Sequence, residues 1–151
     1  MRKSAIPFFF VALAVLALDQ FTKYYIKAHV GPYDVVRVTS FFNIVYAENT
    51  GSAFGMFKSM GGIFFIAVST AASVALSVMI VKDPVNRLAY GLLLGGAVGN
   101  LLDRLIRGYV VDFLDFYAGA FHWPAFNVAD SALTMGIILL FYKAVFKQHS
   151  N

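Results

Sequence analysis

The chain contains no cysteine, which excludes a thiol nucleophile, a disulfide framework and any metal site built on cysteine ligands. Charged residues are scarce, at 13% of 151 residues, whereas 60% of the residues are hydrophobic. The G-x-S-x-G nucleophile elbow, the H-E-x-x-H zinc helix and glycine-rich phosphate loops are also missing. We therefore expect neither a metal site nor a cofactor.

The excess of apolar residues makes lipid the expected solvent for most of this chain. Its mean hydropathy is +0.72, and a soluble domain has too much surface to cover with such a composition. A net charge of +4 could indicate nucleic acid. The basic residues lie beside apolar runs and form no stripe, which favours anionic lipid headgroups instead. We expect membrane lipid as a partner, and no nucleic acid.

Four apolar segments are long enough to cross a bilayer, which takes roughly 20 residues. They predict one integral membrane domain, residues 1–151, that is mainly α and forms a four-transmembrane-helix bundle. The predicted helices lie at about 6–26, 61–81, 88–106 and 126–146, and the extracytoplasmic loops at about 27–60 and 107–125.

The first segment could be read as a cleavable signal, because "MRK" is a basic n-region. Its apolar pattern continues past Asp19 to Ile26, however, and this favours a retained helix. Four crossings place both termini on one side. The predicted loops and termini on the two sides of the membrane contain equal numbers of Lys and Arg. The pair Arg2 and Lys3, beside the first helix, therefore favours cytoplasmic termini.

The first long loop contains "VVRVTSFFNIVYA", a partly alternating run of β-branched and aromatic residues, followed by the turn-forming "ENTG". This pattern predicts a small β-rich cradle on the extracytoplasmic membrane surface. The next residues, "SAFGMF", are amphipathic and predict a short surface helix or loop. In the third segment, Gly91, Gly95 and Gly99 recur every four residues, which is typical of close helix packing.

Ionisable groups in a spanning helix cost roughly 2.5–3.5 kcal/mol each near its centre, so they often mark function. Asp19 and Lys23 are spaced as a helical ion pair, and Asp103 can pair with Arg104 or Arg107. Of the eight acidic residues, six fall at the predicted extracytoplasmic ends: Asp19, Glu48, Asp103, Asp112, Asp115 and Asp130.

Asp112 and Asp130 differ from the others, because neither has a basic residue within four positions. They flank the same loop, at the predicted end of the third segment and start of the fourth, so their carboxyls can converge. Asn127 lies three residues before Asp130, on the same helix face. Two neighbouring carboxyls cannot both ionise cheaply, and sharing one proton gives an acid and a base in one place, as in aspartic proteases. Two unrelated interfacial carboxylates remain an alternative.

Two other functions fit a small membrane protein with buried carboxyls. A proton-coupled transporter would use intramembrane carboxylates as a relay, which predicts acidic groups near the middle of the membrane. A non-catalytic adaptor would use its polar residues only to hold helices together. In that case, replacing Asp112 would affect folding more than activity.

Five stretches in order, "DQFTK", "ENTGSAFG", "GGAVGNLLDR", "GYVVDFLDF" and "WPAFNVADS", resemble the lipoprotein signal peptidase (signal peptidase II) family over nearly the whole chain. The resemblance implies a multi-pass aspartic endopeptidase of the bacterial inner membrane, with its active site towards the extracytoplasmic face. The implied substrate is a diacylglyceryl-modified prolipoprotein, cut just before the lipidated cysteine, and the implied inhibitor is globomycin. One chain holds every part that the chemistry needs, so we expect a monomer.

The resemblance also implies roles for individual residues. Asp112 and Asp130 match the catalytic dyad of the family. Positions that line the substrate site or support the scaffold are matched by Asp19, Lys23, Asn49, Gly51, Ala53, Phe54, Gly99, Asn100, Asp103, Arg104, Asn127 and Ala129.

Overall fold

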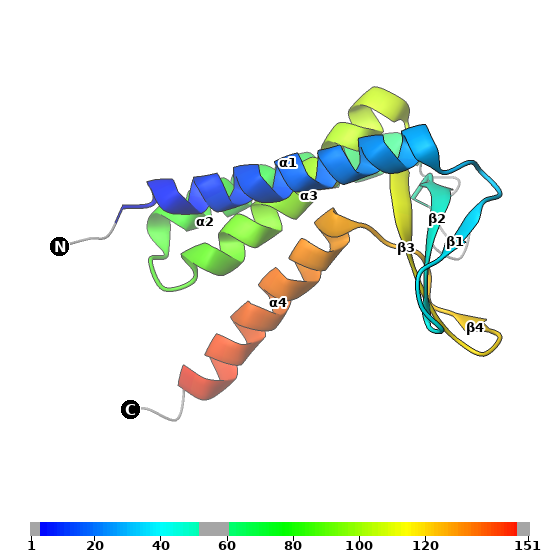
Figure 1. The fold of residues 1–151 in the computed structure, drawn as a ribbon. Coiled ribbons are helices and arrows are strands. Elements are labelled where there is room, and N and C mark those ends of the chain that lie inside the picture. Colours follow the sequence, from blue (N-terminus) through cyan, green and yellow to red (C-terminus); the bar gives the residue numbers. More distant parts are fainter. Residues whose placement is uncertain (1–3, 52–60, 148–151) are drawn as a thin grey trace.

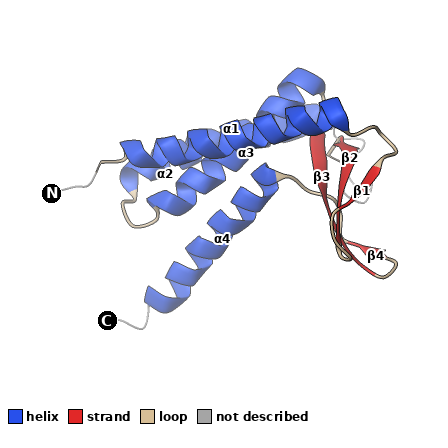
Figure 2. Cartoon of the chain, in the orientation of Figure 1, coloured by secondary structure: helices blue, strands red, loops and turns tan. Residues whose placement is uncertain are grey.

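The computed structural model describes residues 4–51 and 61–147 (Figure 1). Within these ranges a helical bundle carries a small sheet at one end (Figure 2). The elements in chain order are α1 (Ile6–His29), β1 (Val35–Arg37), β2 (Phe42–Asn49), α2 (Gly61–Lys82), α3 (Arg87–Arg107), β3 (Val110–Ala118), β4 (Phe121–His122) and α4 (Val128–Lys147).

The four predicted helices are all present, and the largest difference from the predicted bounds is at the end of α1, which continues to His29. The predicted surface segment "SAFGMF", with Ala53 and Phe54, lies outside the described residues. In Figure 1 the start of α1, the α2–α3 turn and the end of α4 all lie away from the sheet.

Helix α3 is the centre of the bundle and packs extensively against α1, α2 and α4. Its glycines allow this close approach: a Cβ on Gly91 would lie 2.7 Å from the carbonyl oxygen of Phe8, and one on Gly95 would lie 2.7 Å from that of Ala12. The opposite side meets α4, where a Cβ on Gly96 would lie 2.5 Å from the carbonyl oxygen of Ala129. The prediction that the glycines serve helix packing is confirmed.

Because the obstacle at Gly96 is backbone, Gly96→Ala should push α3 and α4 apart and lower the free energy of unfolding by about 1–3 kcal/mol. Thermal unfolding in detergent measures this. Gly62→Ala is the matched control, since no atom of the described residues lies within 4 Å of a Cβ there. In that exposed helix, alanine should be neutral or gain up to about 1 kcal/mol. Equal effects of the two changes would contradict close α3–α4 packing.

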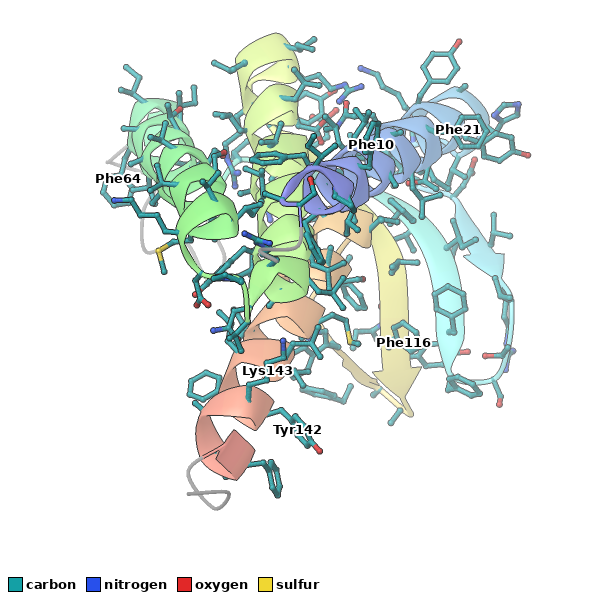
Figure 3. All side chains as sticks on the ribbon, turned by 90° about the vertical axis from the view of Figure 1, so that its left-hand side faces the viewer. Phe10, Phe21, Phe64, Phe116, Tyr142 and Lys143 are labelled. Atoms are coloured by element: carbon teal, nitrogen blue, oxygen red, sulfur yellow. The ribbon has the colours of Figure 1, made fainter. Side chains whose placement is uncertain are left out.

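Three helices are long and apolar enough to cross a membrane: α1, α2 and α4. Their outer surfaces carry exposed apolar side chains, and Phe21, Phe64 and Tyr142 project from the bundle in Figure 3. Helix α3, predicted as a fourth crossing, does not meet the same criterion in the described chain. Its last turns contain Asn100 and Asp103, both buried against the other helices.

The strands form one antiparallel sheet in the order β1-β2-β3-β4. The predicted sheet in the first loop is confirmed by β1 and β2, but the second loop also contributes, and β3 is the longest strand. Gly108, with φ of 81°, ends α3 in a left-handed conformation. The chain then enters the β-branched pair Val110 and Val111. Asp112 therefore lies on a strand, and the prediction that it ends the third helix is wrong.

Apolar side chains fix the sheet to the end of α1. Ile26 of α1 and Val30, the residue after this helix, form a buried cluster with Phe113 of β3, and Ile44 and Tyr46 of β2 pack against it. This cluster holds β2 and β3 at a fixed height relative to the helix ends. The polar residues of the strands are thereby brought to the mouth of the bundle.

Candidate active site

A buried ammonium group holds the bundle together beneath the sheet. Lys23 is fully buried, and its Nζ lies 2.8 Å from Asp19 Oδ2, 3.0 Å from Asp103 Oδ2 and 2.9 Å from Asn100 Oδ1. An ammonium has three N–H donors, so three acceptors match its capacity. The predicted Asp19–Lys23 pair is confirmed, and the contacts of Lys23 with Asp103 and Asn100 join α1 to α3.

The two carboxylates of this cluster bind further elements. Asp19 Oδ1 accepts a hydrogen bond from the backbone N–H of Ala129 at 2.9 Å, which attaches α4. Asp103 Oδ2 accepts one from Val111 N–H at 3.2 Å, which attaches β3, and its other oxygen pairs with Arg107. Buried charges need such complete pairing, since the loss of solvation otherwise exceeds the attraction.

Gln20 also belongs to the cluster around Lys23, although its sequence context predicts no role for it. Its Nε2 lies within 3.1 Å of Asp19 Oδ2, Asp103 Oδ1 and the carbonyl oxygen of Gly99. Only its position beside Asp19 could have indicated this. Gly99 and Ala129 lie at the same crossing, where a Cβ on Gly99 would be 2.6 Å from Asp19 Oδ2. Both are small because three helices meet there.

Asp112 lies above this cluster with its carboxylate between two side-chain amides. Asn49 Nδ2 donates to its Oδ2 at 2.9 Å, and Asn127 Nδ2 donates to its Oδ1 at 2.7 Å. Only 3% of the residue is exposed. Burial raises the pKa of Asp112 to about 6, and the charge of Asp130 adds to this, while the two amide hydrogen bonds oppose it.

Asp130 lies in the first turn of α4 and shares one amide partner, Asn127, with Asp112. Asn100 Nδ2 donates to Asp130 Oδ1 at 2.8 Å, and Asp130 N–H donates to Asn127 Oδ1 at 2.9 Å. Asn127 thus caps the start of α4 and at the same time contacts Asp112. Asn127 therefore links the carboxylate of Asp112 to the first turn of α4. The convergence of the two carboxyl groups stays a prediction.

A groove of about 470 Å³ opens beside Asp130. Its lining is mostly apolar and comes from the segment before α4 and the first turns of that helix: Trp123, Phe126, Asp130, Ser131, Thr134 and Met135. One carboxyl group at the end of an apolar groove fits a ligand that is itself largely apolar.

Arg104 adds a positive charge near the two acids. Its Nη1 donates to the carbonyl oxygen of Asn100 at 3.3 Å, and its guanidinium lies 5.2 Å from the ring centroid of Phe65 on α2. The same ring packs against Gly51, where a Cβ would lie 2.5 Å from it. With φ of 90° as well, this position requires glycine. Of the predicted site residues, those described gather at this end of the bundle.

Comparison with solved structures shows that this fold is similar to that of two bacterial membrane enzymes. One such enzyme, determined by the in meso method at 2.3 Å, superposes with a TM-score of 0.84 and 36% identity, covering 96% of this chain and 90% of that chain. A second, at 1.9 Å, gives a TM-score of 0.83 and 34% identity, covering 91% and 92%.

The family model described as Signal peptidase (SPase) II matches residues 11–146, and the chain belongs to this family. A lipoprotein signal peptidase of Thermodesulfovibrio yellowstonii is 49% identical, covering 85% of this chain and 88% of that protein. Another, of Francisella tularensis subsp. novicida, is 39% identical, covering 100% and 99%.

Proposed function

We propose that this protein removes the signal peptide from diacylglyceryl-modified prolipoproteins by cutting just before the lipidated cysteine, with Asp112 and Asp130 as the catalytic pair. Family membership supports the substrate. The assignment of the pair rests on Asn127, which donates to the carboxylate of Asp112 and accepts from the backbone N–H of Asp130. The direct test incubates purified protein with a lipidated precursor and looks for a product that begins at the modified cysteine.

The chemistry needs one proton on the pair. The ionised carboxyl removes a proton from water, and the oxygen of this water attacks the scissile carbonyl carbon. The protonated carboxyl donates a hydrogen bond to the carbonyl oxygen as negative charge develops there. The tetrahedral intermediate then collapses, its C–N bond breaks, and the cysteine nitrogen leaves as an amine after receiving a proton from the pair. Asn49, Asn100 and Asn127 hold the carboxyls in position throughout.

We propose that the substrate enters from the lipid through the groove beside Asp130. A signal peptide is an apolar helix, and two acyl chains follow it, so the substrate reaches the enzyme only in the bilayer. Trp123, Phe126 and Met135 offer it apolar contacts. We propose that Arg104 binds a substrate carbonyl. Gly51, Ala53 and Phe54 belong to the sequence motif that lines the substrate site in the family that this chain resembles.

This function requires a defined arrangement in the membrane. We propose that α3 also crosses, shielded by the three apolar helices that surround it, and that both termini lie in the cytoplasm. The sheet and the carboxyl pair then face the extracytoplasmic side, at headgroup depth, where water reaches the scissile bond. A monomer suffices, because Asp112, Asp130 and their amide partners all come from one chain.

The transporter alternative gains no support from the position of the acids. Asp19, Asp103, Asp112, Asp115 and Asp130 gather near the sheet end of the bundle, and the fully buried Asp19 and Asp103 are paired with basic residues. A relay would need carboxyls distributed across the membrane. The relatives of this chain are likewise peptidases.

The rate of cleavage should depend on pH through the shared proton. Since burial raises the pKa of Asp112 to about 6, the pair keeps its proton to about that pH, and kcat/KM should fall as pH rises further. Asn49→Ala removes a hydrogen bond that favours the ionised form. The alkaline limb of the pH profile should therefore move to higher pH.

A matched control lies on the same strand. Asn43 Nδ2 also donates to a carboxylate, Asp115 Oδ2, at 2.9 Å, and Asn43→Ala should leave the pH profile in place. The measurement compares the pH at which kcat/KM falls to half its maximum in wild type and in each variant, so a lower maximal rate does not affect it. If Asn49→Ala moves the limb to lower pH, or if Asn43→Ala moves it equally, the placement of Asn49 against the catalytic proton is wrong.

A further inference from the structure

A separate and more polar pocket lies between the end of α1, strand β2 and the residue before β3. Its volume is about 480 Å³, and its polar lining comes from Lys27, His29, Tyr46, Glu48 and Tyr109. Successive side chains of a strand point to opposite faces. Glu48 faces this pocket, while the next residue, Asn49, faces Asp112. The sheet thus separates the pocket from the carboxyl pair.

The pocket holds two opposite charges apart. Lys27 Nζ donates to Tyr109 Oη at 3.1 Å, the hydroxyls of Tyr109 and Tyr46 lie 3.2 Å apart, and Tyr46 Oη donates to Glu48 Oε1 at 2.7 Å. The hydrogen bond from Tyr46 lowers the pKa of Glu48, so this carboxylate stays charged at neutral pH. Among the described residues Lys27 and Glu48 form no direct ion pair, and both are exposed. The two charges therefore remain available to a ligand.

The position of the pocket along α1 places it at the level of lipid headgroups. Tyr24 and Tyr25, just before Lys27, are 69% and 53% exposed on the outside of the helix. Tyrosines in this setting mark the membrane–water interface.

We propose that this pocket binds the phosphoethanolamine headgroup of a membrane phospholipid, with its ammonium against Glu48 and its phosphate against Lys27. A zwitterionic headgroup carries one positive and one negative charge, and the pocket offers Glu48 and Lys27 to bind them, with the phenols of Tyr46 and Tyr109 between the two. The bound lipid would hold β2 and Tyr109 at the membrane surface. The site is independent of the peptidase assignment, because it uses no residue of the catalytic cluster.

The test titrates purified protein in a non-ionic detergent with short-chain phosphatidylethanolamine, phosphatidylcholine and phosphatidylglycerol, using calorimetry. Wild type should prefer phosphatidylethanolamine, because the choline group cannot donate a hydrogen bond and glycerol carries no charge. Glu48→Gln should weaken its binding by about 3- to 10-fold and remove the preference over phosphatidylglycerol. Lys27→Gln should weaken the binding of phosphatidylethanolamine and of phosphatidylglycerol alike, because both carry a phosphate. Arg37→Gln, an exposed change on β1, is the control and should have no effect.

A second variant and a soluble probe sharpen this experiment. Tyr46→Phe removes the hydroxyl that orients Glu48 and should reduce the preference in the same direction. Glycerophosphoethanolamine, which has no acyl chains, should compete for the site if the headgroup is recognised. Equal binding of the three lipids by wild type, an unchanged preference in Glu48→Gln, or no competition by the soluble headgroup would each overturn the proposal.

Discussion

Replacing Asp112 or Asp130 by asparagine is expected to lower the rate of prolipoprotein cleavage by about 10²- to 10⁴-fold, the usual contribution of general acid–base catalysis. Asparagine keeps the size of the side chain and can still hydrogen-bond to a neighbouring amide. It cannot exchange a proton. Both variants should therefore fold, and both should fail in the chemical step. Release of signal peptide from a lipidated precursor, measured in the same detergent for all variants, gives the rates.

Asp115→Asn provides the matched control. Asp115 lies on the same strand, is buried, and accepts a hydrogen bond from an asparagine as Asp112 does. It also pairs with His122, an exposed residue of β4. The control should keep most of its activity. A folded Asp112→Asn or Asp130→Asn enzyme that cuts at near the normal rate would show that the pair is not catalytic.

Replacing Lys23 by methionine is expected to destabilise the fold by about 3–5 kcal/mol, because it leaves buried carboxylates without their cation. Asp19 loses its ion pair with Lys23, and Asp103 keeps its ion pair with Arg107 but loses the one with Lys23. These contacts connect α1 and α3, so the loss should appear as a lower midpoint in thermal unfolding. Activity should fall as well, since Asn100 loses a partner that holds it against Asp130.

The control for this substitution is Lys82→Met. Lys82 is an exposed lysine in the last turn of α2, at the opposite end of the bundle. The change should shift stability by no more than about 0.5 kcal/mol. A Lys23→Met variant as stable as the Lys82→Met variant would mean that the buried cluster is not what holds α1 to α3.

Much of this architecture could be predicted from local sequence. Helix extents follow from runs of apolar residues, and the Asp19–Lys23 and Asp103–Arg107 pairs follow from a spacing of four residues. The strands of the first loop follow from β-branched residues. These signals all come from neighbours within one or two turns, where the backbone geometry fixes which side chains meet.

Strand β3 could not be predicted in the same way. Its residues pair with β2, and the contact between Asn49 and Asp112 spans 63 positions. The sequence of "VVDFLDF" suits either a strand or an interfacial loop, and only the presence of β2 beside it decides. The placement of Asp112 on a strand, and not at a helix end, is a consequence of that pairing.

By itself the sequence indicated that this is a membrane protein and that most of its acidic residues fall at one side of the membrane. It also showed that Asp112 and Asp130 have no basic residue within four positions along the chain. The tertiary structure decided how these two acids are held, through Asn49, Asn100 and Asn127 from three separate parts of the chain. Composition indicates whether a chain is surrounded by lipid or water, and residue spacing indicates which side chains meet within a helix or strand. The partners of a buried side chain depend on how helices and strands pack, and packing is set by all of them at once.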